Sequence, residues 1–322
     1  METLLKGMRA AAEPTRLRIL AACSRTELTV TDLTKILGQS QPRVSRHLKL
    51  LVDAGLLDRN REGTWAYYRL SATGPWVDLT NTLVALIPER DTVLTNDLER
   101  LADVKRARAD WAAAYFKHNA AQWDRVRSLH VDDVEVEQAL KSVLVQGKIH
   151  NLLDIGTGTA RILEVLGGEV DKAVGVDLSH EMLAVARANL ERADLNNCQV
   201  RHGDMYHLPL ADQLFDAVTI HLVLHYAEEP ARVIAEAARM LEPSGQLVVV
   251  DFATHSEENL RIQHGHQRLG FDDDELANWF SAAGLVSGVP VQLAGTPLTV
   301  CLWPASRRVE RIARAAAVGG RR

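Results

Sequence analysis

The segment that most constrains the fold is Leu152–Ala160, in which an apolar run passes directly into a Gly-x-Gly turn. Such a run followed by glycines predicts a buried strand and a tight turn, where the backbone can approach a ligand. From Ile149 onward, short apolar runs alternate with helical stretches, which favours a mostly parallel sheet with helices on both faces. The expected strands are Asn151–Ile155, Lys172–Val176, Gln199–Arg201, Ala217–His221, Gln246–Asp251, Val286–Leu293 and Leu298–Trp303.

Two acidic side chains indicate which ligand this turn would take. Asp154 stands two residues before Gly156, where its carboxylate would repel the pyrophosphate of a dinucleotide. S-adenosylmethionine has no phosphate, and the carboxylate would attract its ammonium and sulfonium groups. Asp177 ends the second strand and suits two ribose hydroxyls, a contact that NAD and S-adenosylmethionine share. Because Arg161 replaces the third glycine of a dinucleotide site, we expect an S-adenosyl ligand.

The first 70 residues predict short helices followed by a hairpin. Thr31 is a plausible N-cap for a helix that stops at Gly38, and Ser40 can cap a helix over Gln41–Ala54. The apolar face of that helix would be Val44, Leu48, Leu51 and Val52. Two strands, Leu56–Arg59 and Trp65–Leu70, would follow, joined by Asn60–Gly63.

Charge supports a contact between this region and a polyanion. Residues 1–70 carry twelve Lys and Arg against seven Asp and Glu, whereas the rest of the chain has 25 against 35. A helix, a turn, a second helix and a hairpin form a winged helix-turn-helix, whose second helix enters the major groove of double-stranded DNA. We therefore expect DNA contacts from Gln41, Arg43, Ser45, Arg46, His47, Lys49, Arg59 and Arg61.

The first 75 residues resemble the DNA-binding domain of ArsR/SmtB-type repressors, through the motifs AEPTRLRIL, ELTVTDL, SQPRVSRHLKLLVDAGLL and REGTWAYYRL. The resemblance implies a homodimer in which residues 2–12 and Trp76–Ile87 form the contact. Metal-sensing members carry cysteines in the segment that matches Glu27–Leu33. Thr29 and Thr31 stand there instead and are poor ligands for thiophilic metals, so no metal sensing is expected.

From about Trp123 to Trp303, the chain resembles Rossmann-like S-adenosylmethionine-dependent methyltransferases. The motifs are LLDIGTGTA, GVDLSHEMLAVAR, GDM, FDAVTIHLVLHY and LEPSGQLVVVDF. The resemblance implies a mostly parallel seven-stranded sheet with an antiparallel strand, and an S-adenosylmethionine or S-adenosylhomocysteine site. Asp177 would bind the ribose hydroxyls, Asp204 the adenine amino group, and His221 would lie near the methyl group or amino acid end. The implied cofactor-binding residues are Asp154, Gly156, Gly158, Asp177, Leu178, Met182, Asp204, Met205 and His221.

Methyl transfer depends mostly on positioning, and it needs a base only where the acceptor loses a proton. The leading candidates for a catalytic base are His221, His225 and Tyr226, and the wider set adds Asp251, His255, His264 and His266. Their spacing does not predict a metal site. Cys23, Cys198 and Cys301 are too few and too far apart for a disulfide framework, a CxxC site or the cysteine set of arsenite methyltransferases.

The chain is expected to have four parts: a winged helix-turn-helix (1–75), a dimerisation helix with a helical linker (76–130), a methyltransferase-like domain (131–305) and a basic tail (306–322). The tail would contact phosphates or form a solvated helix. The linker aromatics would pack against the next domain or line a pocket, and they would carry any coupling between the domains; they are Trp111, Tyr115, Phe116 and Trp123. No apolar run is long enough to span a membrane, so we expect a cytoplasmic protein.

Two functions from different classes follow. The first is a dimeric repressor that binds an operator and uses its methyltransferase-like domain to sense S-adenosylmethionine or S-adenosylhomocysteine. The alternative is an active small-molecule methyltransferase, with the winged helix serving targeting, autoregulation or dimerisation. A fusion with an inactive second domain is disfavoured because Asp154, Gly156, Gly158, Asp177 and Asp204 are all present.

Overall fold

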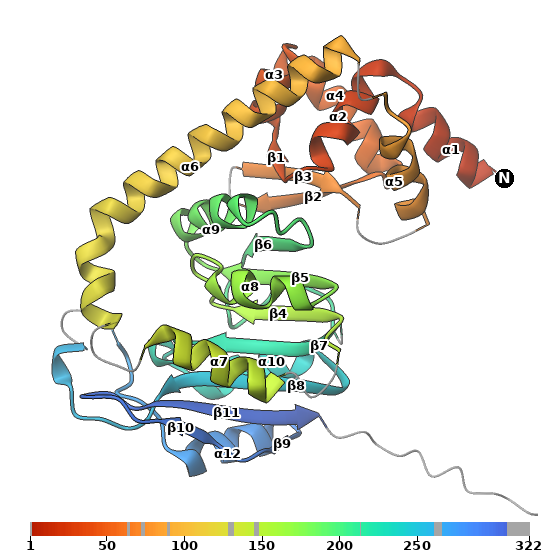
Figure 1. Cartoon of the computed structure of the whole chain (residues 1–322). Helices are drawn as coiled ribbons and strands as arrows, with labels where there is room; N and C mark the ends of the chain where they lie inside the picture. The colour runs from red at the N-terminus through yellow and green to blue at the C-terminus, as the bar shows by residue number, and fades with distance from the viewer. Residues whose placement is uncertain are drawn as a thin grey trace, which may run out of the picture. The chain divides into compact units, whose positions relative to one another are not determined.

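The computed structural model describes residues 2–62, 65–71, 75–88, 91–127, 132–144, 148–212, 214–260 and 266–307 (Figure 1). Within these ranges the side chains of 2–4, 60–62, 65, 109 and 111–127 are not described. The chain divides into two compact units. The first comprises residues 1–124, 157–168 and 174–204, and the second comprises 125–156, 169–173 and 205–322.

The first unit begins with the winged helix-turn-helix that the sequence predicts. A three-stranded sheet of order β1-β3-β2 lies beside its helices, and β3 pairs antiparallel with both neighbours. The strand β1, which pairs with Tyr67 and Tyr68, was not among the expected strands. The elements are α1 (Glu2–Ala11), α2 (Pro14–Cys23), β1 (Leu28–Thr29), α3 (Val30–Leu37), α4 (Gln41–Asp53), β2 (Leu57–Glu62), β3 (Trp65–Leu70) and α5 (Val77–Ala85).

The start of α3 differs from the expectation that Thr31 is its cap. Thr29 is the N-cap: its hydroxyl accepts from the N–H of Asp32 at 3.1 Å, and the Asp32 carboxylate accepts from the N–H of Thr29 at 2.9 Å. This reciprocal capping box needs the acid three residues after the cap, a spacing that Thr29 has and Thr31 lacks. Ser40 does cap α4 by position, but its side chain makes no capping hydrogen bond.

The core of the winged helix is built from the predicted apolar faces. Val44, Leu48 and Leu51 are buried on α4, and they pack with Ile19 and Leu33 in one hydrophobic cluster. Each such side chain contributes about 1.5–3 kcal/mol by leaving water. This cluster therefore holds α4 with its polar face outward.

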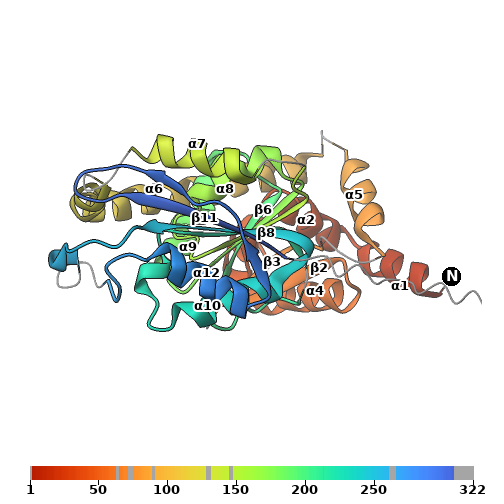
Figure 2. The same ribbon diagram turned by 90° about the horizontal axis from the view of Figure 1, so that it is seen from below.

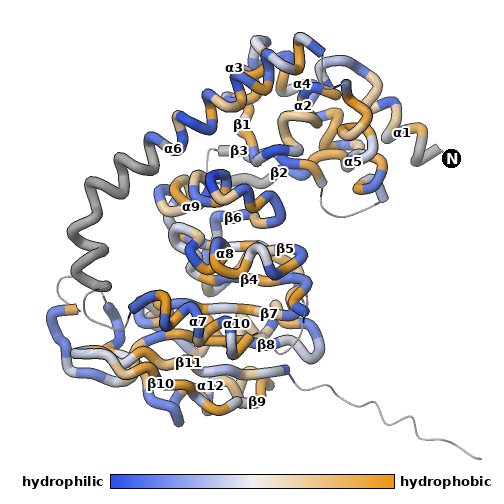
Figure 3. Tube along the Cα trace, viewed as in Figure 1, coloured by the Kyte–Doolittle hydropathy of each residue, from blue (hydrophilic) through white to orange (hydrophobic). Residues whose placement is uncertain are grey.

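A single helix, α6 (Thr92–Arg127, 36 residues), follows within the segment expected as a helical linker. Figure 3 shows hydrophilic and hydrophobic residues alternating along its coloured part. Arg18 of α2 donates to both carboxylate oxygens of Asp97 at 2.6 and 2.7 Å, which fixes the first turns of α6 against α2. The aromatic side chains of Trp111, Tyr115, Phe116 and Trp123 lie outside the described part of the chain.

The first unit also contains most of the second predicted strand, which is β5 (Lys172–Asp177), and three elements near it in sequence. These are α8 (Arg161–Leu166), α9 (His180–Arg192) and β6 (Cys198–His202). The hydroxyl of Ser179 caps α9 by accepting from the N–H of Met182 at 3.2 Å.

The second unit carries the strands β4 (Asn151–Ile155), β7 (Phe215–His221) and β8 (Leu241–Phe252), which are parallel, and β11 (Val300–Arg307), which is antiparallel to β8. Seen from below in Figure 2, α7 (Asp133–Leu144) lies on one face of these strands. The opposite face is covered by α10 (Pro230–Met240) and α12 (Asp273–Ala282). This is the layered α/β arrangement that the alternating pattern predicts.

The larger sheet has the order β10-β11-β8-β7-β4-β5-β6, with β9 paired to β11, so it has eight strands where seven were expected. The difference arises because the segment expected as one strand, Val286–Leu293, forms β9 (Leu285–Ser287) and β10 (Val291–Leu293). Both short strands pair with β11, and Pro290, which has no N–H to donate, lies in the interruption between them. β11 reaches Arg307, so the tail expected from residue 306 begins inside a strand, and residues 308–322 lie outside the described chain. Among the described helices, none is both long and apolar enough to cross a membrane.

Candidate functional site

The outer face of α4 carries polar and cationic side chains. Those exposed there are Gln41, Arg43, Ser45, Arg46 and Lys49. A groove of about 530 Å³ lies between α4 and the hairpin, and its lining includes Gln41, Ser45, Lys49, Arg59 and Tyr68. Donors on an exposed helix beside a basic hairpin suit base edges and phosphates of duplex DNA.

Two of the predicted DNA contacts differ from the rest. The His47 ring is only partly exposed, and its Nδ1 lies 3.6 Å from the Glu13 carboxylate, so it faces the start of α2 and not the groove. Burial alone would raise the pKa of Glu13, but hydrogen bonds from Arg16 and Thr15 and the charge of His47 lower it. The side chain of Arg61 lies outside the described residues.

The predicted glycine turn follows β4 with the backbone that its sequence requires. Gly156 has a φ of 72°, and a Cβ at that position would lie 2.6 Å from the Val223 side chain. Gly158 has a φ of 51°, and a Cβ there would meet no atom within 4 Å. Glycine is therefore needed at 156 for packing, whereas at 158 it leaves the backbone accessible to a ligand. Ala160, which stands where glycine is more usual, adopts a φ of 65°.

The carboxylate of Asp177 in the first unit is hydrogen-bonded to this turn. One carboxylate oxygen accepts from the N–H of Gly158 and the other from the N–H of Ser179, both at 2.8 Å. An ionised carboxylate has about four acceptor positions, so both oxygens can still accept from hydroxyl groups. Leu178 beside it is 65% exposed, and Met182 is partly exposed one turn into α9.

Asp154 lies at the end of β4 in the second unit and is 1% exposed. One of its oxygens accepts from the hydroxyl of Thr219 on β7 at 2.6 Å. A buried carboxylate is tolerated only with such partners. The structure therefore places this carboxyl group at the strand end that the sequence predicts.

The segment after β6 carries the residues predicted for adenine. The N–H of Gly203 donates to the carbonyl of Asp177 at 3.0 Å, which ties the ends of β5 and β6 together, and Asp204 follows with an exposed side chain. His180 and His202 stack beside these strand ends with ring centroids 4.1 Å apart and planes inclined by 6°. Sequence reasoning missed this pair; the available signal was that His180 lies within one predicted motif and His202 directly precedes another.

Several predicted catalytic candidates meet in the second unit. His225 is buried, and its ring Nδ1 lies 2.8 Å from one carboxylate oxygen of Asp251. The backbone N–H of His225 donates to the other oxygen at 3.1 Å. The His225 ring stacks on that of His266 at 4.0 Å and lies 4.2 Å from that of Tyr226. A carboxylate on Nδ1 orients the ring and favours Nε2 as the proton acceptor. His221 is partly exposed at the end of β7, and His264 lies outside the described residues.

Near this pair, burial lowers the pKa of His255, and the neighbouring charges of Glu257 and Asp251 only partly oppose that shift. Its Nδ1 accepts from the N–H of Glu257 at 3.2 Å. In the described part of the chain, no three His, Cys, Asp or Glu side chains are placed to share a metal ion.

Two segments of the chain match known families. Residues 13–59 match the family described as bacterial regulatory protein, arsR family, and residues 153–249 match the one described as methyltransferase domain. The first match runs from α2 into β2 and contains α4. The second runs from β4 to β8 and contains the glycine turn and Asp177.

Curated proteins and solved structures are similar to part of this chain. A demethylmenaquinone methyltransferase from Listeria welshimeri is 34% identical over 143 residues, which are 42% of this chain and 60% of the relative. An arsenite methyltransferase from Aquipseudomonas alcaligenes is 37% identical over 110 residues, 31% of this chain and 32% of the relative. The chain thus spans less than two thirds of either relative. A candidate methyltransferase from Bacillus halodurans C-125 aligns over 54% of this chain and 100% of its own, with 19% identity and a TM-score of 0.50, a likeness of fold.

Proposed function

Because the chain joins an ArsR-family regulatory domain to a Rossmann-like methyltransferase domain, we propose that it is a DNA-binding transcriptional regulator whose methyltransferase domain binds S-adenosylmethionine or S-adenosylhomocysteine as an effector. The observation that carries the proposal is that one chain contains two candidate binding sites. One is the cationic face of α4, and the other is the glycine turn braced by Asp177.

The ligand contacts follow from the chemistry of the site. The remaining acceptor positions of Asp177 would bind two ribose hydroxyls, and the exposed Leu178 would cover the adenine with Met182. The buried charge of Asp154 favours a cationic amino acid end. Asp204 would accept from the adenine amino group, with Met205 and His221 near the bound molecule.

The same proposal makes the protein a homodimer through α1 and the region of α5. Leu5 and Met8 on α1 are 40% and 48% exposed, and Leu86 after α5 is 72% exposed. Large apolar side chains left in water on neighbouring helices are typical of a surface that another molecule covers. A dimer would also present two α4 helices to an operator of two half-sites.

DNA binding is tested by fluorescence anisotropy with a duplex selected from a random library by the full-length protein. Arg43→Ala with Arg46→Ala should weaken binding by at least about 10-fold and reduce the salt dependence, since both exposed cations are lost. Lys35→Ala is the matched control, because it removes an exposed cation that lies on α3 and not on α4. Wild-type affinity in the double variant would remove α4 as the DNA-reading helix.

A second function, methyl transfer to a small molecule, is favoured by the His225–Asp251 pair. In that reaction a lone pair of the acceptor forms the bond to the methyl carbon, the S–C bond breaks to leave S-adenosylhomocysteine, and Nε2 of His225 takes the acceptor proton. The test is release of S-adenosylhomocysteine in the presence of catechol, thiol and amine acceptors. Release that is lost in His225→Asn would favour the enzyme.

Arsenite is not supported as the acceptor, despite the similarity to an arsenite methyltransferase. Binding of trivalent arsenic requires thiolates. All three cysteines are buried, and burial raises the pKa of Cys198 and Cys301 to about 11. The thiolate form is therefore scarce at neutral pH.

A further inference from the structure

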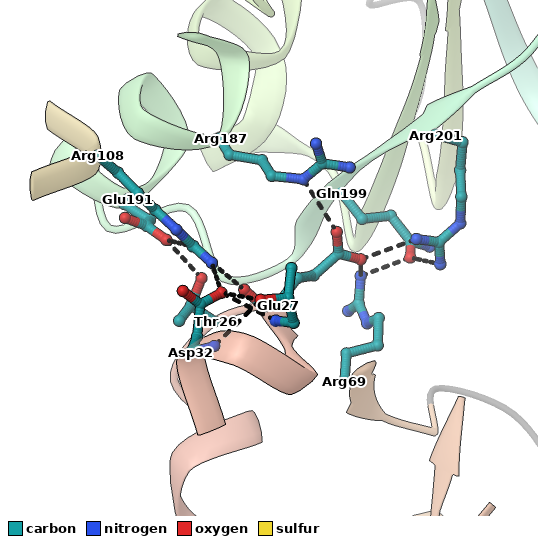
Figure 4. A network of polar contacts seen from close by, with 10 residues as sticks. Thr26, Glu27, Asp32, Arg69, Arg108, Arg187, Glu191, Gln199 and Arg201 are labelled. Atoms are coloured by element: carbon teal, nitrogen blue, oxygen red, sulfur yellow. Dashed lines mark hydrogen bonds and ion pairs between the residues drawn. The ribbon is translucent and has the colours of Figure 1, made fainter. Parts of the chain in front are cut away.

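Seven charged side chains form two clusters of ion pairs inside the first unit, and the backbone carbonyl of Glu27 joins them into one polar network (Figure 4). We call it the ionic network. It contains three carboxylates and four guanidinium groups: Glu27, Asp32 and Glu191 with Arg69, Arg108, Arg187 and Arg201. The winged helix supplies some of these groups and the α9–β6 segment supplies others, so the network joins the two.

Glu27 is the centre of one half of the ionic network. Its buried carboxylate lies 2.8 Å from Arg201 on β6, 3.5 Å from Arg187 on α9 and 3.6 Å from Arg69 on β3. The Arg187 guanidinium also stacks on the ring of Tyr67, 3.7 Å from its centroid. One carboxylate thus gathers guanidinium groups from three elements.

Arg108 of α6 is the centre of the other half. It donates to Glu191 on α9 at 2.6 Å, to Asp32 on α3 at 2.8 Å and to the carbonyl of Glu27 at 3.1 Å. Thr26 donates its hydroxyl to the same oxygen of Glu191 at 2.7 Å. Asp32 is also the capping-box residue of α3, so this half reaches the helix that precedes α4.

The two faces of β3 separate the ionic network from the DNA-reading groove. Ala66 and Tyr68 line the groove beside α4. Tyr67 and Arg69 alternate with them and contact the α9–β6 segment. Because successive side chains of a strand point to opposite faces, a single strand contacts both sites. A shift of β3 would change both together.

The α9–β6 segment is also the part of the chain closest in sequence to the proposed ligand contacts. Asp177 accepts from the N–H of Ser179, the N-cap of α9, and its carbonyl accepts from the N–H of Gly203, two residues after Arg201. A ligand on Asp177 would therefore act at the start of α9 and the end of β6. Both elements carry residues of the ionic network.

The ionic network is chemically suited to a reversible conformational change. Removing charges from water costs about as much as their mutual attraction returns, so a buried ion-pair network adds little net stability. When the partners separate, water solvates every charge again. A hydrophobic joint of the same size would lose the whole benefit of burial on opening. Two arrangements of an ionic joint can thus lie close in free energy, as a switch requires.

We propose that the ionic network transmits ligand occupancy from the α9–β6 segment to β3 and α3, and so changes the affinity of α4 for DNA. The proposal rests on the regulatory function proposed above. Its specific claim is that the network, and not either binding site, sets the response to ligand. Loss of one network carboxylate should uncouple two binding events that each remain intact.

The test uses full-length protein and measures DNA affinity with and without S-adenosylhomocysteine, on a duplex selected from a random library. In wild type the ligand should change the affinity by about 5-fold or more. Glu27→Gln and Glu191→Gln each remove one charge from a different half of the network, and the change should fall below about 2-fold. Asp103→Asn is the matched control, because its pair with Arg106 is exposed on α6 and lies outside the network.

Calorimetry of S-adenosylhomocysteine, and DNA affinity without ligand, should stay within about 3-fold of wild type in both variants. A second readout needs no DNA: ligand should alter hydrogen exchange of the amides that pair β1 with β3 in wild type, and should not in Glu191→Gln. Variants that bind both partners and keep the full ligand response would overturn the network as the route, and the regulatory function would stand. A wild-type protein that selects no duplex, or whose DNA affinity ignores both cofactor forms, would instead overturn the regulatory function and this inference with it.

Discussion

At the scale of single residues, acidic side chains at strand ends accept hydrogen bonds from the protein itself. Asp177 accepts from the N–H groups of Gly158 and Ser179, and thereby sets the conformation of the turn that would meet the ligand. Asp154 is fixed by Thr219 in the same way beneath β4. Acceptors that are already oriented lose little entropy when a ligand binds.

We predict that Asp177→Ala weakens S-adenosylhomocysteine binding by about 10-fold or more. The substitution removes the acceptor for the ribose and leaves the N–H groups of Gly158 and Ser179 without this partner, which costs about 1–3 kcal/mol. Isothermal titration calorimetry measures the effect. Asp171→Asn is the control, since that acid is exposed at the start of β5. Equal affinity in wild type and Asp177→Ala would remove Asp177 from the ligand site.

We also predict that the cysteines do not react in the folded protein. All three are buried, and burial raises the pKa of Cys198 and Cys301 to about 11 and that of Cys23 further. Because the thiolate is the reactive species, little modification by a thiol reagent is expected at pH 8 in buffer. Three modified thiols should appear in urea, by mass spectrometry. Rapid labelling of a cysteine without denaturant would contradict its burial.

At the scale of elements, a helix cap and the ionic network meet at the start of α3. The capping box of Thr29 and Asp32 begins α3, and Asp32 also accepts from Arg108 on α6. A local feature of the sequence therefore also serves a contact between segments distant in sequence. The start of α3 is thus determined by both local and tertiary contacts.

We predict that Thr29→Ala destabilises the winged helix by about 1 kcal/mol, because the N–H of Asp32 loses its capping hydroxyl. Thr31→Ala is the matched control and should change stability by less than about 0.5 kcal/mol, since Thr31 is exposed and is not the cap. Urea unfolding monitored by circular dichroism compares the two. A larger effect at Thr31 would reverse the assignment of the cap.

At the scale of the whole molecule, acid should weaken the ionic network. Burial by itself raises the pKa of Glu27 and of Asp32, but the charge of Arg201, Arg187 and Arg69 on the first, and of Arg108 on the second, lowers each below its ordinary value. A carboxyl group with a lowered folded-state pKa contributes stability that is complete above its unfolded-state pKa. That contribution is lost as pH falls through the folded-state value.

Between pH 7 and about 5, these groups should leave the melting temperature unchanged. At pH values below the ordinary glutamate pKa of 4.5, the melting temperature should decrease. Glu27→Gln removes one of these titrations, so its decrease with acid should be shallower than that of wild type. Differential scanning fluorimetry across pH measures both. An identical acid slope in the two proteins would contradict the lowered pKa of Glu27.

The proposed dimer makes a separate prediction for the molecule. Leu5→Glu with Met8→Glu places charges on the exposed apolar face of α1 and should shift the protein toward monomer in sedimentation velocity. Val289→Glu is the control, because Val289 is 83% exposed and lies between β9 and β10. A wild-type protein that sediments as a monomer at micromolar concentration would exclude this dimer.

Features that depend on neighbours along the chain could be predicted from the sequence. Apolar periodicity predicted α4 and the parallel strands, and the glycine turn with Asp154 and Asp177 predicted the kind of ligand, because turn chemistry and strand ends are local properties. Tertiary structure alone decided which distant side chains meet. Nothing in the spacing of Glu27, Arg108 and Arg201 indicates that they share one network, because 174 positions separate the first from the last. The pairing of His225 with Asp251 likewise depends on a contact that forms only when the chain folds. The cap at Thr29 and the division of residues 286–293 into two strands, by contrast, follow local features that the prediction did not use: the spacing of Thr29 and Asp32, and Pro290.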